Sequence, residues 1–138
     1  MGGISFGRMV LAGLVLLHAG LLVWALMGLA EWIAGEVPWP AVTNPLFPRP
    51  MLLFHWLSVI AASTAFLAGL TLRWRGTPIA VALGYAAMGL VCLIETIHYL
   101  VHDTRWLAMA AEYAAYLAIG SWLFLSETAR STFRRAPA

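Results

Sequence analysis

The stretch IAVALGYAAMGLVCLIETIHYLV, Ile79–Val101, is long and apolar enough to decide how this chain folds. Its 23 residues contain a single charged side chain, Glu95, and neither lysine nor arginine. An α-helix needs about 20 apolar residues to cross the hydrocarbon core of a bilayer. The stretch therefore predicts a membrane-spanning helix that carries one carboxyl group and one histidine, His98, near its end.

Three further stretches have the same character: Met9–Leu29, Met51–Leu72 and Trp106–Leu125. The chain is 62% hydrophobic and only 10% charged, whereas soluble domains carry about 25% charged residues. Arg8 precedes the first stretch, as in a signal peptide, but the apolar run is too long and no clear cleavage site follows. We therefore predict an all-α integral membrane protein, a single membrane domain over residues 1–138 with four transmembrane helices.

Short connections between the later stretches predict how the helices are arranged. The segments RWRGTP, residues 73–78, and HDTRW, residues 102–106, leave room for little more than a tight turn. Helices joined by such turns lie antiparallel to one another, so an up-down bundle is the expected fold. No internal repeat is visible, and an inverted-repeat transporter therefore gains no support.

The placement of arginine predicts the orientation in the membrane. One set of connections and ends carries Arg8, Arg73, Arg75, Arg130, Arg134 and Arg135, whereas the opposite side holds only Arg49 and Arg105. Cytoplasmic loops carry an excess of basic residues, so both termini should be cytoplasmic in a multi-pass protein of the cell (inner or plasma) membrane. The net charge of +2 is too small and too scattered for a nucleic-acid partner.

The connection between the first two stretches, residues 30–50, differs from the other two. It contains five of the seven prolines and two of the seven tryptophans. Proline interrupts a helix, so we expect a loop without a continuous helix. Its apolar residues suggest that this loop lies along the outer membrane interface.

Ionisable side chains from three predicted helices should lie at one depth in the outer leaflet. A rise of about 1.5 Å per residue places Glu95, His98, Glu112 and His55 in one layer, with His102 at its mouth. Charged groups inside a membrane are costly and normally face the bundle interior, where they pair. The layer is therefore the candidate functional site.

A metal ion is the first ligand that this layer could hold. Glu95 and His98 form a Glu-x-x-His pair, which presents a carboxylate and an imidazole on adjacent turns, as in helical-bundle metal sites. Glu112 and His55 would complete the set of ligands, with His102 outer or substituting. Iron, zinc and copper are all chemically admissible, and a single Glu-x-x-His favours one ion over two.

A haem b is the second possibility. His55, with His98 or His102, could supply two axial ligands to a haem held between the helices. The carboxylates fit this arrangement less well unless they meet the edge of the ring. A small redox or electron-transfer subunit that carries a metal or haem is accordingly the leading functional hypothesis, with His18 interpreted as a packing histidine at mid-depth.

Two readings without a cofactor remain open. Glu95, Glu112 and His98 could perform acid–base chemistry on a lipid-phase substrate or a quinone, as a small enzyme or proton-coupled carrier would, although no nucleophile motif or phosphate-binding loop accompanies them. Alternatively, the layer could be structural, in an accessory subunit of a larger membrane complex. In every case the expected partners are the lipid bilayer and other membrane subunits or further copies of the chain.

Overall fold

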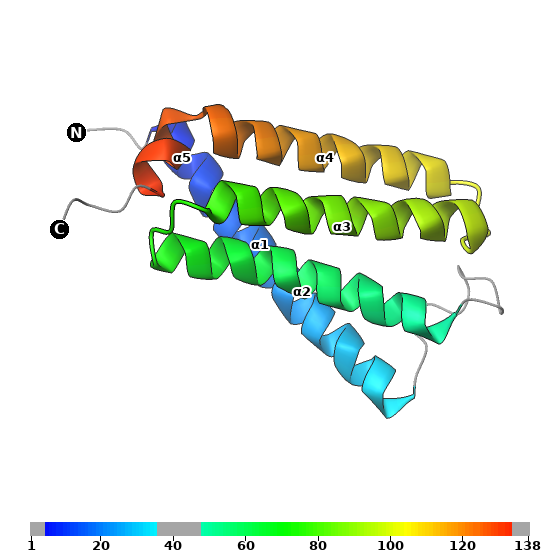
Figure 1. The fold of residues 1–138 in the computed structure, drawn as a ribbon. Helices are drawn as coiled ribbons and strands as arrows, with labels where there is room; N and C mark the ends of the chain where they lie inside the picture. Colours follow the sequence, from blue (N-terminus) through cyan, green and yellow to red (C-terminus); the bar gives the residue numbers. More distant parts are fainter. Residues whose placement is uncertain (1–4, 36–47, 134–138) are drawn as a thin grey trace.

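The computed structural model describes residues 5–35 and 48–133. This part of the chain folds into helices α1 (Phe6–Ala34), α2 (Arg49–Thr71), α3 (Thr77–His98), α4 (Arg105–Leu125) and the short α5 (Glu127–Thr132), shown in Figure 1. The first four are long and apolar enough to cross a membrane. The prediction of four spanning helices is therefore confirmed, whereas α5 was not predicted.

Helix α1 departs most from its predicted bounds. It has 29 residues and extends past Met9–Leu29 at both ends. Its length of about 44 Å, at 1.5 Å per residue, exceeds a hydrocarbon core of about 30 Å, which a helix accommodates by tilting. Figure 1 shows α1 crossing the other helices obliquely, while the axes of α2, α3 and α4 are nearly aligned with one another.

Both ends of the loop predicted at residues 30–50 belong to helices. Its first residues form the last turn of α1, and Arg49 and Pro50 begin α2. Proline is well suited to that position because the first turn of a helix needs no amide donor there. The rest of the predicted loop, residues 36–47, lies outside the described residues.

Consecutive spanning helices run antiparallel (Figure 1). α1 packs against α2, α2 against α3 and α3 against α4. The turn between α2 and α3 is closed by Arg73, whose φ of 49° is left-handed, and by a 2.9 Å hydrogen bond from the Trp74 amide to the Gly69 carbonyl. This geometry is a common way to end a helix.

Glycines let these helices approach closely at defined points. A Cβ built on Gly84 of α3 would lie 2.6 Å from the Cβ of Ala62 and 2.8 Å from its Cα. Gly28 of α1 lies against the indole ring of Trp56 in the same way. The contacts with α2 therefore depend on the absence of a side chain at both positions, as small residues allow in membrane bundles.

The core lies between α1, α2 and α3, where the largest fully buried side chains include Trp56, Phe66 and His18. In α4 only Leu123 is buried, and large apolar side chains such as Leu107 and Leu117 are exposed. In a membrane these surfaces contact lipid chains, which are as apolar as leucine.

Candidate functional site

His55 of α2 and Glu95 of α3 are in hydrogen-bond contact inside the bundle. The imidazole Nδ1 lies 3.2 Å from each carboxylate oxygen, and Glu95 is only 7% exposed. An ionised carboxylate only accepts hydrogen bonds, so Nδ1 is the donor to Glu95 when this carboxyl group is ionised. The two residues were predicted at one depth, and the structure brings them into direct contact.

The other ring nitrogen of His55 is the most unusual polar atom of the site. Nε2 is buried and has no hydrogen-bond partner among the described residues. In a neutral imidazole whose proton lies on Nδ1, Nε2 is an acceptor. Rings of Trp24 and Trp56 meet the imidazole edge-on, with centroids at 5.8 and 4.8 Å, so they limit its rotation.

Glu112 of α4 forms a second polar group. Its carboxylate accepts a hydrogen bond from the Tyr116 hydroxyl one turn later. On α3, the Cys92 thiol lies 3.9 Å from the Thr96 hydroxyl. The hydrogen bond between Tyr116 and Glu112 is therefore made within α4.

Tyr116 connects this group to a deeper one. Its ring stacks on Tyr85 of α3 with a centroid distance of 4.8 Å and an interplanar angle of 21°. The Tyr85 hydroxyl lies 3.0 Å from Nε2 of His18, and the His18 ring stacks on Phe66 at 4.4 Å. His18 is fully buried and packs as a hydrogen-bonded core residue, as its position suggested.

A cavity of about 290 Å³ lies between the four spanning helices. Both polar groups contribute to its wall. It is lined by Leu17, Leu21, Trp24, His55, Ser58, Val59, Tyr85, Met88, Glu112, Ala115, Tyr116 and Ile119. The site is thus a mainly apolar chamber with a few polar atoms, which is the usual character of a small-molecule pocket.

The hydroxyl groups of the cavity wall already donate. Ser58 donates to the backbone carbonyl of His55 at 2.8 Å, Tyr116 donates to Glu112, and Tyr85 faces Nε2 of His18. His55 Nε2 and the Glu112 carboxylate, in contrast, can still accept. A molecule that matches this wall must bring hydrogen-bond donors.

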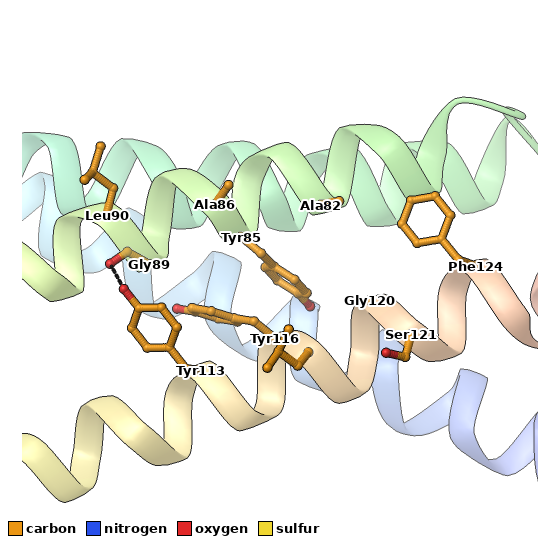
Figure 2. Close-up of a pocket in the computed structure, with 11 residues that line it drawn as sticks. Ala82, Tyr85, Ala86, Gly89, Leu90, Tyr113, Tyr116, Gly120, Ser121 and Phe124 are labelled. Atoms are coloured by element: carbon orange, nitrogen blue, oxygen red, sulfur yellow. Dashed lines mark hydrogen bonds between the residues drawn. The ribbon is translucent and has the colours of Figure 1, made fainter.

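A groove of about 360 Å³ lies beside the cavity, between α3 and α4 (Figure 2). Its lining comprises Ala82, Tyr85, Ala86, Gly89, Leu90, Tyr113, Tyr116, Leu117, Gly120, Ser121 and Phe124. The Tyr113 hydroxyl donates to the Gly89 carbonyl at 2.7 Å. Tyr85 and Tyr116 line both spaces, and Figure 2 shows their rings lying across the gap between the two helices.

The remaining predicted ligands lie apart from this site. His98 is the last residue of α3 and is exposed, next to the ring of Tyr99. His102 lies in the turn before α4, where its Nδ1 is 3.0 Å from the Thr104 hydroxyl. Among residues 5–35 and 48–133, no three histidine, cysteine or acidic side chains gather closely enough to hold a metal ion. The predicted set of four metal ligands is therefore not assembled in this part of the chain.

Sequence reasoning overlooked Tyr85 as a site residue. Together with Met88 and Glu95 it lies at offsets of 0, 3 and 10 along α3, which places the three residues on one helical face. That spacing could have identified it. The contribution of Trp24 could not have been found in this way, because it depends on the oblique path of α1.

No protein-family model, no curated protein and no solved structure matches this chain significantly. The class of the protein therefore rests on its own fold. Four helices long and apolar enough to span a bilayer define a multi-pass membrane protein. The cavity between these helices is its candidate functional site.

Proposed function

We propose that this membrane protein binds a small lipid-soluble molecule in the cavity between its spanning helices, through a head group that donates hydrogen bonds. The observation that carries this proposal is the buried Nε2 of His55, which has no partner among the described residues while Nδ1 is held by Glu95. A buried polar atom without a partner costs about 1–3 kcal/mol. A donor on a ligand would remove that cost.

The polar atoms of the wall define the head group. His55 Nε2 and the Glu112 carboxylate accept, while the neighbouring hydroxyls of Ser58 and Tyr116 already donate. A hydroxyl or amine head fits this pattern, whereas a group with acceptors only leaves both sites unsatisfied. Aromatic walls at Trp24 and Tyr85 suit a planar head.

Proton transfer is the chemistry that the pair of His55 and Glu95 can add. If the head gives its proton to Nε2, an imidazolium forms 3.2 Å from the Glu95 carboxylate, which stabilises the positive charge. A carboxylate that orients a histidine in this way is a common arrangement for a general base. Acid–base work on a lipid-phase substrate, or proton-coupled carriage of it, is consistent with this site.

A metal ion or haem at His55 is the second candidate, and one observation favours it. Histidines that bind metals usually donate their other ring N–H to a carboxylate, as Nδ1 of His55 does to Glu95. Elemental analysis and an absorption spectrum of protein purified in mild detergent test this candidate. Metal or Soret absorbance that is lost in His55→Ala and kept in His98→Ala would support His55 as a ligand.

The proposal also covers the orientation of the protein in the membrane and its membrane partners. The arginine distribution supports cytoplasmic termini, an orientation that puts the pair of His55 and Glu95 in the outer half of the cell membrane. The exposed apolar surface of α4 contacts lipid and offers the face on which further membrane subunits could pack.

A matched pair of probes tests the leading proposal. 4-Octylphenol carries one hydroxyl donor, and its methyl ether, 4-octylanisole, has the same ring and tail with a methyl group in place of the donor proton. In lipid nanodiscs, titration calorimetry should show saturable binding of the phenol to the wild type and to His98→Ala, but not to His55→Ala. A separate titration with decylamine tests a ligand with an amine head.

Equal binding of 4-octylphenol and 4-octylanisole would overturn the proposal, because the donor would then contribute nothing. Unchanged phenol binding in His55→Ala would overturn it as well. Circular dichroism and elution volume of each variant show whether the bundle remains folded.

A further inference from the structure

We propose that the groove between α3 and α4 is a second binding surface, which holds the linear apolar tail of the molecule whose head lies in the cavity. This inference rests on the proposed function and specifies its ligand: an amphipathic molecule with a compact donor head and an unbranched tail. It also implies that the ligand reaches the cavity sideways from the bilayer.

Adjacency of the two spaces carries the argument. The stacked rings of Tyr85 and Tyr116 line both the cavity and the groove and form the wall that they share. Figure 2 shows these two rings in the gap between α3 and α4. A molecule with its head at His55 therefore has the groove on the far side of these rings, and its tail enters the groove where the rings move apart.

The lining of the groove suits an aliphatic chain. Small residues on both helices, Ala82, Ala86 and Gly120, leave the channel open, and a Cβ added at Gly120 would meet nothing within 4 Å. The hydroxyl groups of Tyr85, Tyr113 and Tyr116 have partners in His18, Gly89 and Glu112. Ser121 is the remaining polar side chain of the lining. From Tyr113 to Phe124 the groove follows about 16 Å of α4, a length suited to a linear tail.

The rim of the groove lies on the exposed outer surface of the bundle. Leu90, Leu117 and Phe124 line it and are 59%, 71% and 47% exposed. In a membrane that surface is in contact with lipid chains, so a lipid-soluble molecule meets the groove without crossing water. Tyr116 donates its hydroxyl to Glu112 of its own helix, so a shift of its ring breaks the stacking on Tyr85 of α3 and no hydrogen bond to that helix.

The tail gains little from the hydrophobic effect when it moves from lipid into the groove, because both environments are apolar. The informative test is therefore to fill the groove. Gly120→Leu places a side chain in open space within the groove, and Gly20→Leu is the matched control, since Gly20 on α1 also has nothing within 4 Å of its added Cβ. Ala86→Leu fills the groove from the α3 side.

The experiment measures equilibrium dissociation constants of 4-octylphenol and 4-ethylphenol in nanodiscs, expressed per lipid. In Gly120→Leu and in Ala86→Leu, 4-octylphenol should bind roughly tenfold more weakly, because the tail and the new side chain would overpack the same space. 4-Ethylphenol should bind these variants as it binds the wild type. Gly20→Leu should bind both probes normally.

Three outcomes overturn the inference, and they are distinguishable. If both groove variants bind 4-octylphenol as the wild type does, the tail lies elsewhere while the head site stands. If both probes lose affinity equally in the groove variants, the substitutions disturb the head site and not a tail site. If neither phenol binds the wild type, the proposed function itself fails.

Discussion

His55 on α2 and Glu95 on α3 are 40 residues apart in the chain, and the imidazole Nδ1 lies 3.2 Å from both carboxylate oxygens. This contact fixes the rotation and the depth of two helices relative to each other. It also sets which ring nitrogen of His55 carries the proton when Glu95 is ionised, and so which nitrogen is left without a partner among the described residues.

The contact should be measurable as a coupling between the two residues. Glu95→Ala leaves the buried Nδ1–H without its acceptor and should lower the free energy of unfolding by about 1–3 kcal/mol. His55→Ala should do the same to the carboxylate. Each single variant already breaks the contact. The double variant should therefore lose about 0.5–3 kcal/mol less free energy of unfolding than the sum of the losses in the two single variants. Unfolding in mixed detergent micelles measures the loss in all three variants, and strictly additive losses would contradict a direct contact between His55 and Glu95.

Close packing of α3 on α2 leads to a second prediction. Gly84→Ala would force a Cβ to within 2.6 Å of Ala62, and overpacking of this kind costs about 1–3 kcal/mol. Gly13→Ala on α1 introduces the same methyl group where nothing lies within 4 Å, so it should have little effect. The two variants are compared by thermal unfolding in detergent. Equal stabilities would show that the helices are further apart than described.

Two tyrosines of the groove lining should respond differently to loss of the hydroxyl group. Tyr85→Phe leaves Nε2 of the fully buried His18 without its partner, which should cost about 1–3 kcal/mol. Tyr113→Phe removes a partly buried bond to the Gly89 carbonyl, and about 0.5–1.5 kcal/mol is the usual contribution of such a bond. Tyr85→Phe should therefore have the lower melting temperature of the two variants. The reverse order would contradict the arrangement around His18.

The proposed orientation is tested by labelling with an impermeant thiol reagent in intact cells. In a Cys92→Ala background, Asp103→Cys in the turn before α4 should react, because that turn would lie outside. Ser131→Cys in α5 should react only after the cells are opened. Both positions are exposed, so accessibility differs only through the membrane. The opposite pattern would place the pair of His55 and Glu95 in the inner half of the membrane.

Much of the fold could be predicted because apolar length determines which segments cross a membrane. The predicted bounds Met51–Leu72 and Trp106–Leu125 agree with α2 and α4 to within two residues. The end of α3 could not be predicted as well. The apolar run continues to Val101, but the backbone leaves the helix at Tyr99, where φ is −126°.

Only part of the candidate site could be predicted, because the sequence pattern gives the depth of a residue along its helix more directly than the direction of its side chain. Depth along a helix follows from residue counting, so His55 and Glu95 were correctly matched. The direction that a side chain faces around a helix depends on how the helices pack, which counting residues along each helix does not capture. His98 therefore falls at an exposed helix end, whereas Glu112 reaches the cavity wall beside Tyr116.

The central claim is that Nε2 of His55 accepts a hydrogen bond from the head of a lipid-soluble ligand. Nitrogen-15 NMR of histidine-labelled protein in nanodiscs observes this atom directly, with His55→Gln used to assign its signal among the four histidines. We predict an unprotonated Nε2 whose resonance shifts on addition of 4-octylphenol and stays in place with 4-octylanisole. A protonated Nε2 in the free protein, or a resonance that 4-octylphenol leaves unchanged, would contradict the account.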